Sequence, residues 1–206
     1  MWLGVTTCVF DLGGVVVLWD PVAAVAAAVG QERAERFVQG ELFDFAAWNH
    51  AQDAGRSFAE AEAAARASHP ELAEEIAAYR PHFEHSLLGL VPGTSEILRA
   101  LHQRGTRLVA LTNWSAETFH HAPERFPDIF ALFDDVVVSG AEGIAKPDPA
   151  IFQVLARRLG QPLDDVFYVD DSAHNVEAAR AAGMDAVHFT DAATLRSDLV
   201  RRALLD

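Results

Sequence analysis

Five short runs of β-branched and aromatic residues, each bounded by turn residues, alternate along this chain with longer helical stretches. This alternation is typical of a parallel sheet whose strands are connected by helices. Gly105, Gly160 and Gly183 each follow a predicted helix where a C-terminal cap would lie, which supports the assignment. The predicted strands are residues 5–10, 107–111, 135–138, 166–169 and 186–189, and the predicted helices are residues 94–104, 115–121, 149–159 and 173–182.

The segment between the first and second predicted strands is about ninety residues long, far more than one crossover helix needs. Residues 21–88 are rich in Ala and Glu with helical spacing, and they contain no convincing strand. We therefore expect a small helical subdomain inserted into the α/β core. The predicted boundaries are 1–19 and 89–206 for the core and 20–88 for the helical subdomain.

Composition and charge limit the class of protein. Of 206 residues, 50% are hydrophobic, which is enough to bury a core, and the formal net charge of −14 disfavours contact with nucleic acid or an anionic membrane. Cys8 is the only cysteine, so no intramolecular disulfide forms and a reducing compartment fits. No apolar run reaches the roughly 20 residues of a membrane span, and the start of the chain lacks a basic targeting region. We expect a cytoplasmic monomer or homodimer.

Polar residues follow four of the predicted strands. Ligands of an open parallel sheet bind beyond the carboxyl ends of its strands, so these residues are expected to lie together. Taken singly, each residue also has an ordinary structural explanation. Asp11 would be a turn residue ahead of two glycines, Thr112 and Asn113 would cap a helix, and Lys146 would be a surface lysine. The adjacent pair of aspartates is harder to explain, because two neighbouring carboxylates repel each other unless a cation lies with them. The set comprises Asp11, Thr112, Asn113, Lys146, Asp170 and Asp171.

These residue types suit phosphoryl transfer assisted by a hard divalent cation. Mg²⁺ takes oxygen ligands and commonly bridges carboxylates to a substrate phosphate. Lys146 and Thr112 are then expected to neutralise and hydrogen bond the phosphoryl group. Asp11 becomes the predicted nucleophile, and its attack would form an aspartyl phosphate that water hydrolyses.

The same residues resemble the four loop motifs of the haloacid dehalogenase (HAD) superfamily. They appear in order as residues 10–15 (FDLGGV), 111–114 (LTNW), 145–149 (AKPDP) and 169–172 (VDDS). The resemblance implies a three-layer Rossmann-like core with a helical type 1 cap, the arrangement of subfamily IA, and residues 13–19 are similar to the family's squiggle-and-flap segment. Within the superfamily, the chain looks closest to sugar-phosphate phosphatases of the glucose-1-phosphate phosphatase type and to the N-terminal phosphatase domain of soluble epoxide hydrolases.

The resemblance also implies individual roles. Asp11 would be the nucleophile and a Mg²⁺ ligand, the Gly13 carbonyl and Asp171 would bind the metal directly, and Asp170 would bind it through water. Thr112, the Asn113 backbone N–H and Lys146 would hold the phosphoryl oxygens. The remaining support for the last loop would come from Ser172 and Asn175.

One position departs from the family pattern. Most family phosphatases carry an acid/base aspartate two residues after the nucleophile, whereas this chain has Gly13 there. Such a group typically contributes about 10²- to 10⁴-fold to the rate. The glucose-1-phosphatase type is similar in lacking this aspartate. An anomeric phosphate leaves readily, so we hypothesise a sugar 1-phosphate or a similarly activated ester.

The cap is expected to set specificity by closing over the site. Its aromatic residues are interpreted either as pocket walls facing a sugar ring or as contacts between cap helices. The substrate-binding candidates are Trp114, Trp48 and His50, and His50 is also the one candidate for a substitute acid. Other aromatic residues that could line the pocket are Trp19, Phe43 and Phe45.

Two other functions stay open at this point. A dehalogenase also uses a carboxylate nucleophile and lacks the second aspartate, although it needs no Mg²⁺. A phosphate-binding protein that has lost catalysis is the other alternative, since Gly13 replaces the acid/base residue.

Overall fold

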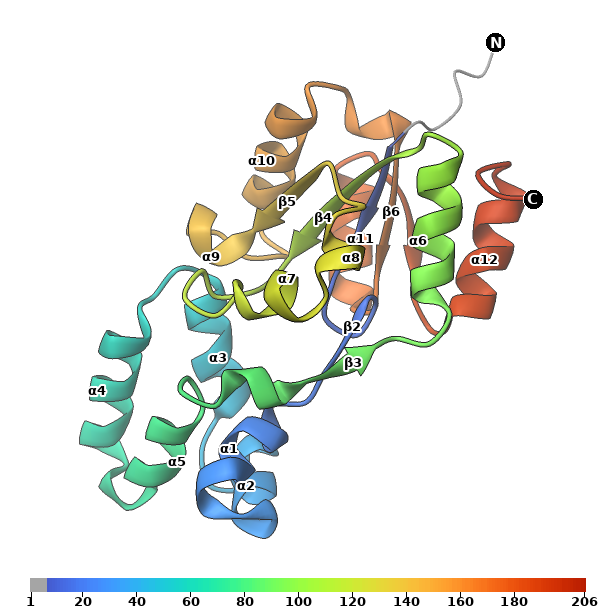
Figure 1. Cartoon of the computed structure of the whole chain (residues 1–206). Coiled ribbons are helices and arrows are strands. Elements are labelled where there is room, and N and C mark those ends of the chain that lie inside the picture. The colour runs from blue at the N-terminus through green and yellow to red at the C-terminus, as the bar shows by residue number, and fades with distance from the viewer. Residues whose placement is uncertain (1–6) are drawn as a thin grey trace.

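The computed structural model describes residues 7–206, and its centre is a five-stranded sheet in the order β5-β4-β1-β6-β7 (Figure 1). All four neighbouring pairs are parallel, which confirms the predicted α/β fold. Residues 5 and 6 of the first predicted strand lie outside the described residues, and the other predicted ends are correct to within one residue. The strands are β1 (Thr7–Phe10), β4 (Arg107–Thr112), β5 (Asp135–Val138), β6 (Val166–Asp170) and β7 (Asp185–His188).

Helices cover both faces of this sheet and complete the three-layer core (Figure 1). Successive side chains of a strand point to opposite faces, so Val9 packs with α10 (Pro149–Leu159) and α11 (Ala173–Ala181). Cys8 and Phe10 pack on the other face with α6 (Thr94–Gln103) and α12 (Ala192–Arg201). The predicted helix stops are confirmed, because Gly105, Gly160 and Gly183 have φ of 75°, 67° and 103°.

The predicted helix at residues 115–121 is wrong. Residues 116–120 form turns, and the helix begins later, as α7 (His121–Arg125), followed by α8 (Pro127–Phe130). The reason lies in packing: the Trp114 carbonyl accepts a hydrogen bond from the Gly140 N–H at 3.0 Å rather than from the next turn of a helix. Gly140 belongs to α9 (Ser139–Glu142), and a Cβ on it would lie 2.6 Å from the Ala116 nitrogen.

The insertion after β1 is helical, as predicted. Side chains of Asp20, Asp44 and Ser57 cap three of its helices by accepting backbone N–H groups. Its α-helices are α1 (Pro21–Val29), α2 (Gln31–Val38), α3 (Phe45–Asp53), α4 (Phe58–Ser68) and α5 (Ala73–Ala78), and its short 3₁₀ turns are Pro70–Leu72 and Phe83–Ser86. Among residues 7–206, no helix is long and apolar enough to cross a membrane.

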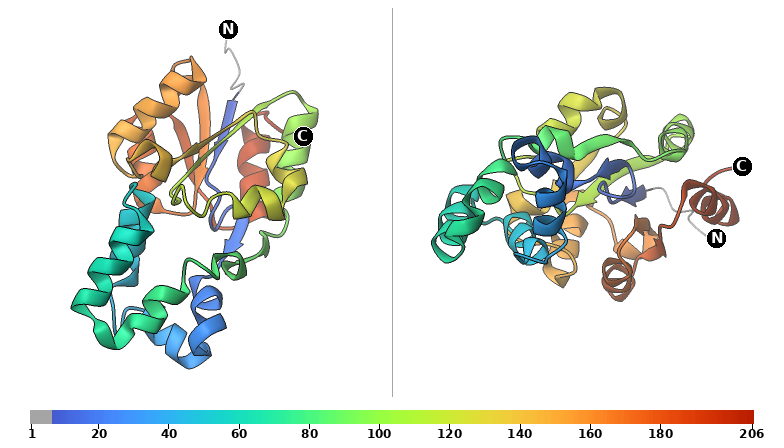
Figure 2. Two further views of the ribbon diagram at one scale, coloured as in Figure 1. Left: turned by 60° about the vertical axis from the view of Figure 1, so that its left-hand side comes forward. Right: turned by 90° about the horizontal axis from the view of Figure 1, so that it is seen from below.

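A two-stranded antiparallel ribbon, which the sequence did not predict, joins the insertion to the core (Figure 2, left). It pairs β2 (Val17–Trp19) with β3 (Leu87–Leu90). These strands are three and four residues long, and β3 contains Gly89, so neither carries a strong strand pattern. The ribbon lies beyond the carboxyl end of β1 and brings the insertion to the edge of the sheet where the predicted site residues lie.

An aromatic cluster holds the helices of the insertion together. Phe37 stacks on Phe43 with ring centroids 5.0 Å apart, and Trp48 contacts Phe45 at 5.8 Å and Tyr79 at 5.9 Å. Pairs at these separations stabilise beyond the area they bury. Most of the aromatic residues of the insertion therefore serve packing.

Candidate active site

Asp11 lies directly after the central strand β1. Its backbone N–H donates to the Val169 carbonyl at 2.9 Å, which fixes the residue against β6. Oδ1 accepts from the Leu12 N–H at 2.7 Å and lies 3.0 Å from the Lys146 ammonium. Among the described residues both contacts are made by Oδ1, so Oδ2 is available for an electrophile or a cation.

Lys146 and Asp170 form a buried ion pair behind Asp11. The Lys146 Nζ donates to Asp170 Oδ2 at 2.7 Å and to the Leu111 carbonyl at 2.9 Å. Asp170 also accepts from the Tyr168 hydroxyl, from the Ser172 N–H at 2.8 Å and from the Asn175 amide at 3.1 Å. Burial raises the pKa of Asp170, but Lys146 and these donors outweigh it and hold the pKa below its ordinary value.

Oxygen atoms of Asp11, Asp170 and Asp171 approach one another within 4.8 Å, with one ammonium beside them. Three carboxylates and one lysine leave two negative charges unbalanced when all are ionised. Burial raises the pKa of Asp11 to about 7; Lys146 opposes this shift, and the repulsion of Asp170 and Asp171 adds to it. Burial and Asp170 likewise raise the pKa of Asp171. A hard divalent cation, which prefers carboxylate oxygens, balances such a charge, and the residues present therefore fit Mg²⁺.

The oxygens of Asp170 are already occupied by four donors, whereas Asp171 is exposed and faces the cavity described below. Asp171 and Asp11 are consequently the better placed direct metal ligands.

Gly14 makes room for Asp171. Its φ is +72°, and a Cβ there would lie 2.2 Å from Asp171 Oδ2. We expect Gly14→Ala to displace that carboxylate and weaken Mg²⁺ affinity by about 10- to 100-fold, as for other residues that orient metal ligands. The Mg²⁺ concentration needed for half-maximal activity measures this. Gly89→Ala is the control, because nothing lies within 4 Å of its added Cβ, and equal Mg²⁺ requirements in both variants would contradict the assignment.

Asn113 ties the loop after β4 to the loop that carries Lys146. Its Nδ2 donates to the Lys146 carbonyl and its Oδ1 accepts from the Lys146 N–H, both at 2.8 Å. The side chain of Asn113 is thus occupied, which leaves the backbone N–H for the predicted phosphoryl contact. Thr112 is the last residue of β4 and is buried beside this loop.

A cavity of about 320 Å³ opens between the carboxyl ends of the strands and the insertion. Its wall combines carboxylates and amides with aromatic rings, and it includes Gly13 and Gly14 of the loop after β1. The lining residues are Asp11, Gly13, Gly14, Trp19, Asn49, Asp53, Tyr79, Phe83, Asn113, Trp114 and Asp171.

The structure corrects two predicted substrate-binding residues. Trp114 lines the cavity as expected, but Trp48 is buried in the aromatic cluster, where its indole N–H donates to the Ala61 carbonyl at 3.3 Å. His50 is exposed and does not line the cavity. The side chains of α3 that face the cavity are one helical turn apart, at Asn49 and Asp53, so Trp48 and His50 point elsewhere.

Sequence reasoning missed Asn49, Asp53, Tyr79 and Phe83. One signal was present for Asp53: it is the last residue of α3, where a negative charge opposes the helix dipole. Burial raises the pKa of Asp53 to about 7, against the smaller lowering effects of the nearby Ser115 backbone N–H and of Lys146. The cavity therefore holds a third carboxyl group, contributed by the insertion.

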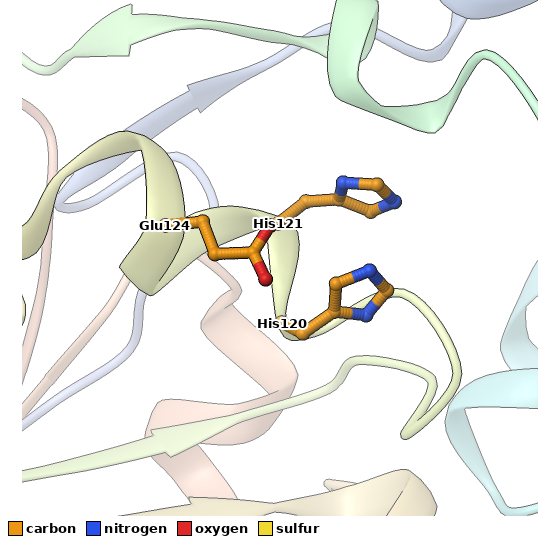
Figure 3. A group of neighbouring side chains, drawn as sticks. All are labelled: His120, His121 and Glu124. Carbon is orange, nitrogen blue, oxygen red and sulfur yellow. The ribbon is translucent and has the colours of Figure 1, made fainter.

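A second group of possible metal ligands lies at the start of α7 (Figure 3). It consists of His120, His121 and Glu124, of which only His121 is partly buried, and none of the three lines the cavity. Two imidazoles favour zinc or a similar transition metal, whereas carboxylates alone favour Mg²⁺. The aspartate group is therefore the one suited to Mg²⁺.

Comparison with known proteins points to one family. The chain is 26% identical over 191 residues to a sesquiterpene phosphatase of Aspergillus oryzae, covering 89% of each chain. It is 31% identical over 191 residues to a phosphoglycolate phosphatase of Cereibacter sphaeroides, covering 89% of this chain and 84% of that protein. The magnesium complex of the HAD family enzyme BT-2542 from Bacteroides thetaiotaomicron shares the fold, with a TM-score of 0.73 at 20% identity and coverage of 96% and 99%.

The family assignment rests on most of the chain. The match begins before β1, includes the helical insertion and ends after α11, so it spans all the loops that build the site. Because residues 5–183 match the haloacid dehalogenase-like hydrolases, this chain belongs to that family.

Proposed function

We propose that this chain is a Mg²⁺-dependent phosphatase that hydrolyses a small phosphomonoester through an aspartyl phosphate on Asp11. The carrying observation is the Asp11 carboxylate, which lines the cavity with one oxygen held by Leu12 and Lys146. The fixed oxygen orients the other one toward an incoming phosphorus. The two relatives that this chain matches over most of their length are both named as phosphatases, which supports phosphatase activity.

The residues around Asp11 would bind the metal ion and the phosphoryl group. Asp11, the Gly13 carbonyl and Asp171 would hold Mg²⁺, with Asp170 contributing through water. Mg²⁺ held by these residues would supply positive charge to neutralise the phosphoryl oxygens and the carboxylates. Lys146 adds a fixed ammonium, with Thr112 and the Asn113 N–H as hydrogen-bond donors to the phosphoryl group.

The cavity limits the substrate to a small molecule, since about 320 Å³ is at the lower end of ligand pockets. Trp19, Tyr79, Phe83 and Trp114 offer aromatic faces. The Trp114 indole N–H is buried and has no hydrogen-bond partner in the described part of the chain, so a substrate oxygen would satisfy it. These features favour a sugar phosphate, the substrate class of the glucose-1-phosphate phosphatase type that the motifs resemble.

The proposal includes the division of the chain. Residues 20–88 would act as a cap that excludes water, and residues 1–19 and 89–206 would form the catalytic core. Free phosphorylated metabolites are the proposed partners, rather than nucleic acid or membrane, for a cytoplasmic monomer or homodimer.

Phosphate release tests the function directly. The panel comprises hexose 1-phosphates, hexose 6-phosphates, nucleotides and an aryl phosphate, each with Mg²⁺ or with EDTA. We expect Mg²⁺-dependent release that is faster from hexose 1-phosphates than from hexose 6-phosphates. The double variant His120→Ala/His121→Ala, which removes the second group of ligands, should keep the same Mg²⁺ dependence.

Two results would contradict the proposal. Phosphate release unchanged by EDTA would show that the reaction does not need a divalent cation. Halide release from 2-haloacids without any phosphate release would assign the dehalogenase activity instead.

A further inference from the structure

The phosphatase reaction needs a proton donor for the leaving group, and the loop after β1 does not supply one. Gly13 faces open space, since no atom lies within 4 Å of an added Cβ. Of the carboxyl groups that line the cavity, Asp11 is assigned as nucleophile and Asp171 as metal ligand. Asp53, contributed by the insertion, is the one that remains.

We propose that Asp53 is the general acid and base of this enzyme, replacing from the insertion the group that Gly13 lacks. The inference rests on the proposed phosphatase function. It assigns to α3 a direct part in catalysis, in addition to the covering role of a cap.

A hydrogen bond within α3 orients the Asp53 side chain. Its Oδ2 accepts from the Asn49 amide, one helical turn earlier, at 3.1 Å. The backbone N–H of Ser115, in the loop after β4, is near enough to the carboxylate to lower its pKa. The carboxyl group thus lies between α3 and the core, where it is positioned for proton transfer.

The backbone of Asp53 is anchored to the core, so the end of α3 is fixed relative to Asp11. The Asp53 carbonyl accepts from the Ser139 hydroxyl at 2.6 Å, and the same hydroxyl oxygen accepts from the Trp114 N–H at 3.0 Å. Two residues later, Gly55 approaches the core so closely that a Cβ on it would lie 3.0 Å from Gly143 Cα. The end of α3 lies against α9, as the ribbon in Figure 1 shows.

The surroundings of Asp53 suit a group that must both give and take a proton. Its pKa is raised to about 7, mainly by burial, and the best general acid or base has a pKa near the working pH. The charged or titratable groups that face it are Lys146, which favours the carboxylate, and Tyr79, whose own pKa is raised by burial and by Asp53. Asp11 and Asp171 line the same cavity.

Two steps then close the cycle. In the first, Asp11 Oδ2 bonds to phosphorus, the bond from phosphorus to the leaving oxygen breaks, and protonated Asp53 gives its proton to that oxygen, which leaves as an alcohol. In the second, the Asp53 carboxylate takes a proton from water, the water oxygen bonds to phosphorus, and the bond to Asp11 breaks. Inorganic phosphate leaves, and Asp53 is again protonated.

The two steps can be distinguished in Asp53→Asn by comparing substrates with a poor and a good leaving group. With an alkyl phosphate, we expect turnover to fall by about 10²- to 10⁴-fold, because an unprotonated alkoxide is a poor leaving group. With p-nitrophenyl phosphate, whose phenolate leaves without help, we expect a fast burst of p-nitrophenolate equal to the active sites. Slow turnover follows, because the aspartyl phosphate on Asp11 then lacks a base.

A rescue variant distinguishes catalysis from folding. Gly13→Asp in the Asp53→Asn background places an acid in the open space after β1 and should recover at least about ten-fold of the lost alkyl phosphatase activity. Unchanged turnover in Asp53→Asn would overturn the inference. So would an equal loss on both esters with no burst and no rescue, since that pattern indicates a structural role. Failure of the proposed function itself is distinct, because wild-type enzyme would then release phosphate from neither ester.

Discussion

Replacing Lys146 by methionine is expected to lower the free energy of unfolding by about 3–5 kcal/mol, the usual effect of breaking a buried ion pair from one side. The Lys146 ammonium is fully buried and lies 3.0 Å from Asp11 and 2.7 Å from Asp170. Methionine fills a similar volume but leaves both carboxylates without their counter-charge. The loss is a large part of the stability of an ordinary domain, and urea unfolding in EDTA measures it.

Two further variants show whether charge is the cause. Arg104→Met removes an exposed pair with Asp206 and should cost no more than about 1 kcal/mol. Adding Asp11→Asn to Lys146→Met should recover part of the lost stability, because it removes one uncompensated carboxylate. A Lys146→Met protein as stable as the Arg104→Met control would show that the ion pair is not a stabilising element.

Asp11→Asn is expected to lower phosphatase turnover by at least about 10⁴-fold, because it removes the nucleophile of a covalent mechanism and the neighbouring carboxylates are committed to metal binding and proton transfer. Asparagine keeps the shape of the side chain and the Leu12 contact, but its amide does not form an acyl phosphate. Phosphate release under saturating Mg²⁺ measures the effect. Retained cooperative unfolding in EDTA is the control for folding, and residual activity within ten-fold of wild type would contradict the role of Asp11.

The core of the fold was predictable because its strands are apolar runs that alternate with capped helices. β5 was predicted to the residue, and β4, β6 and β7 to within one residue. The loops after these strands also converge as expected, since parallel strands end at one edge of the sheet. Lys146, Asp11 and Asp170 consequently meet although they are far apart in the sequence.

The insertion was less predictable, because helices such as α1, α3 and α4 carry apolar side chains on more than one side. The sequence predicts a helical insertion but does not indicate which face of α3 meets the cavity, because that face depends on tertiary packing. Trp48 packs into the aromatic cluster, and Asp53 lies at the cavity only because the end of α3 docks on Ser139 and Gly143. The β2–β3 ribbon was missed for a related reason, since its pairing joins residues about seventy positions apart and is not a local signal.

Transfer of a phosphoryl group to Asp11 is tested most directly by mass analysis of the acid-quenched enzyme. Wild-type protein is mixed with Mg²⁺ and p-nitrophenyl phosphate, quenched during turnover and digested. We expect one phosphoryl group on the peptide that contains Asp11, and none on the same peptide of Asp11→Asn. Rapid phosphate release by wild-type enzyme with the phosphoryl group on another residue, or with none bound at any time during turnover, would contradict it.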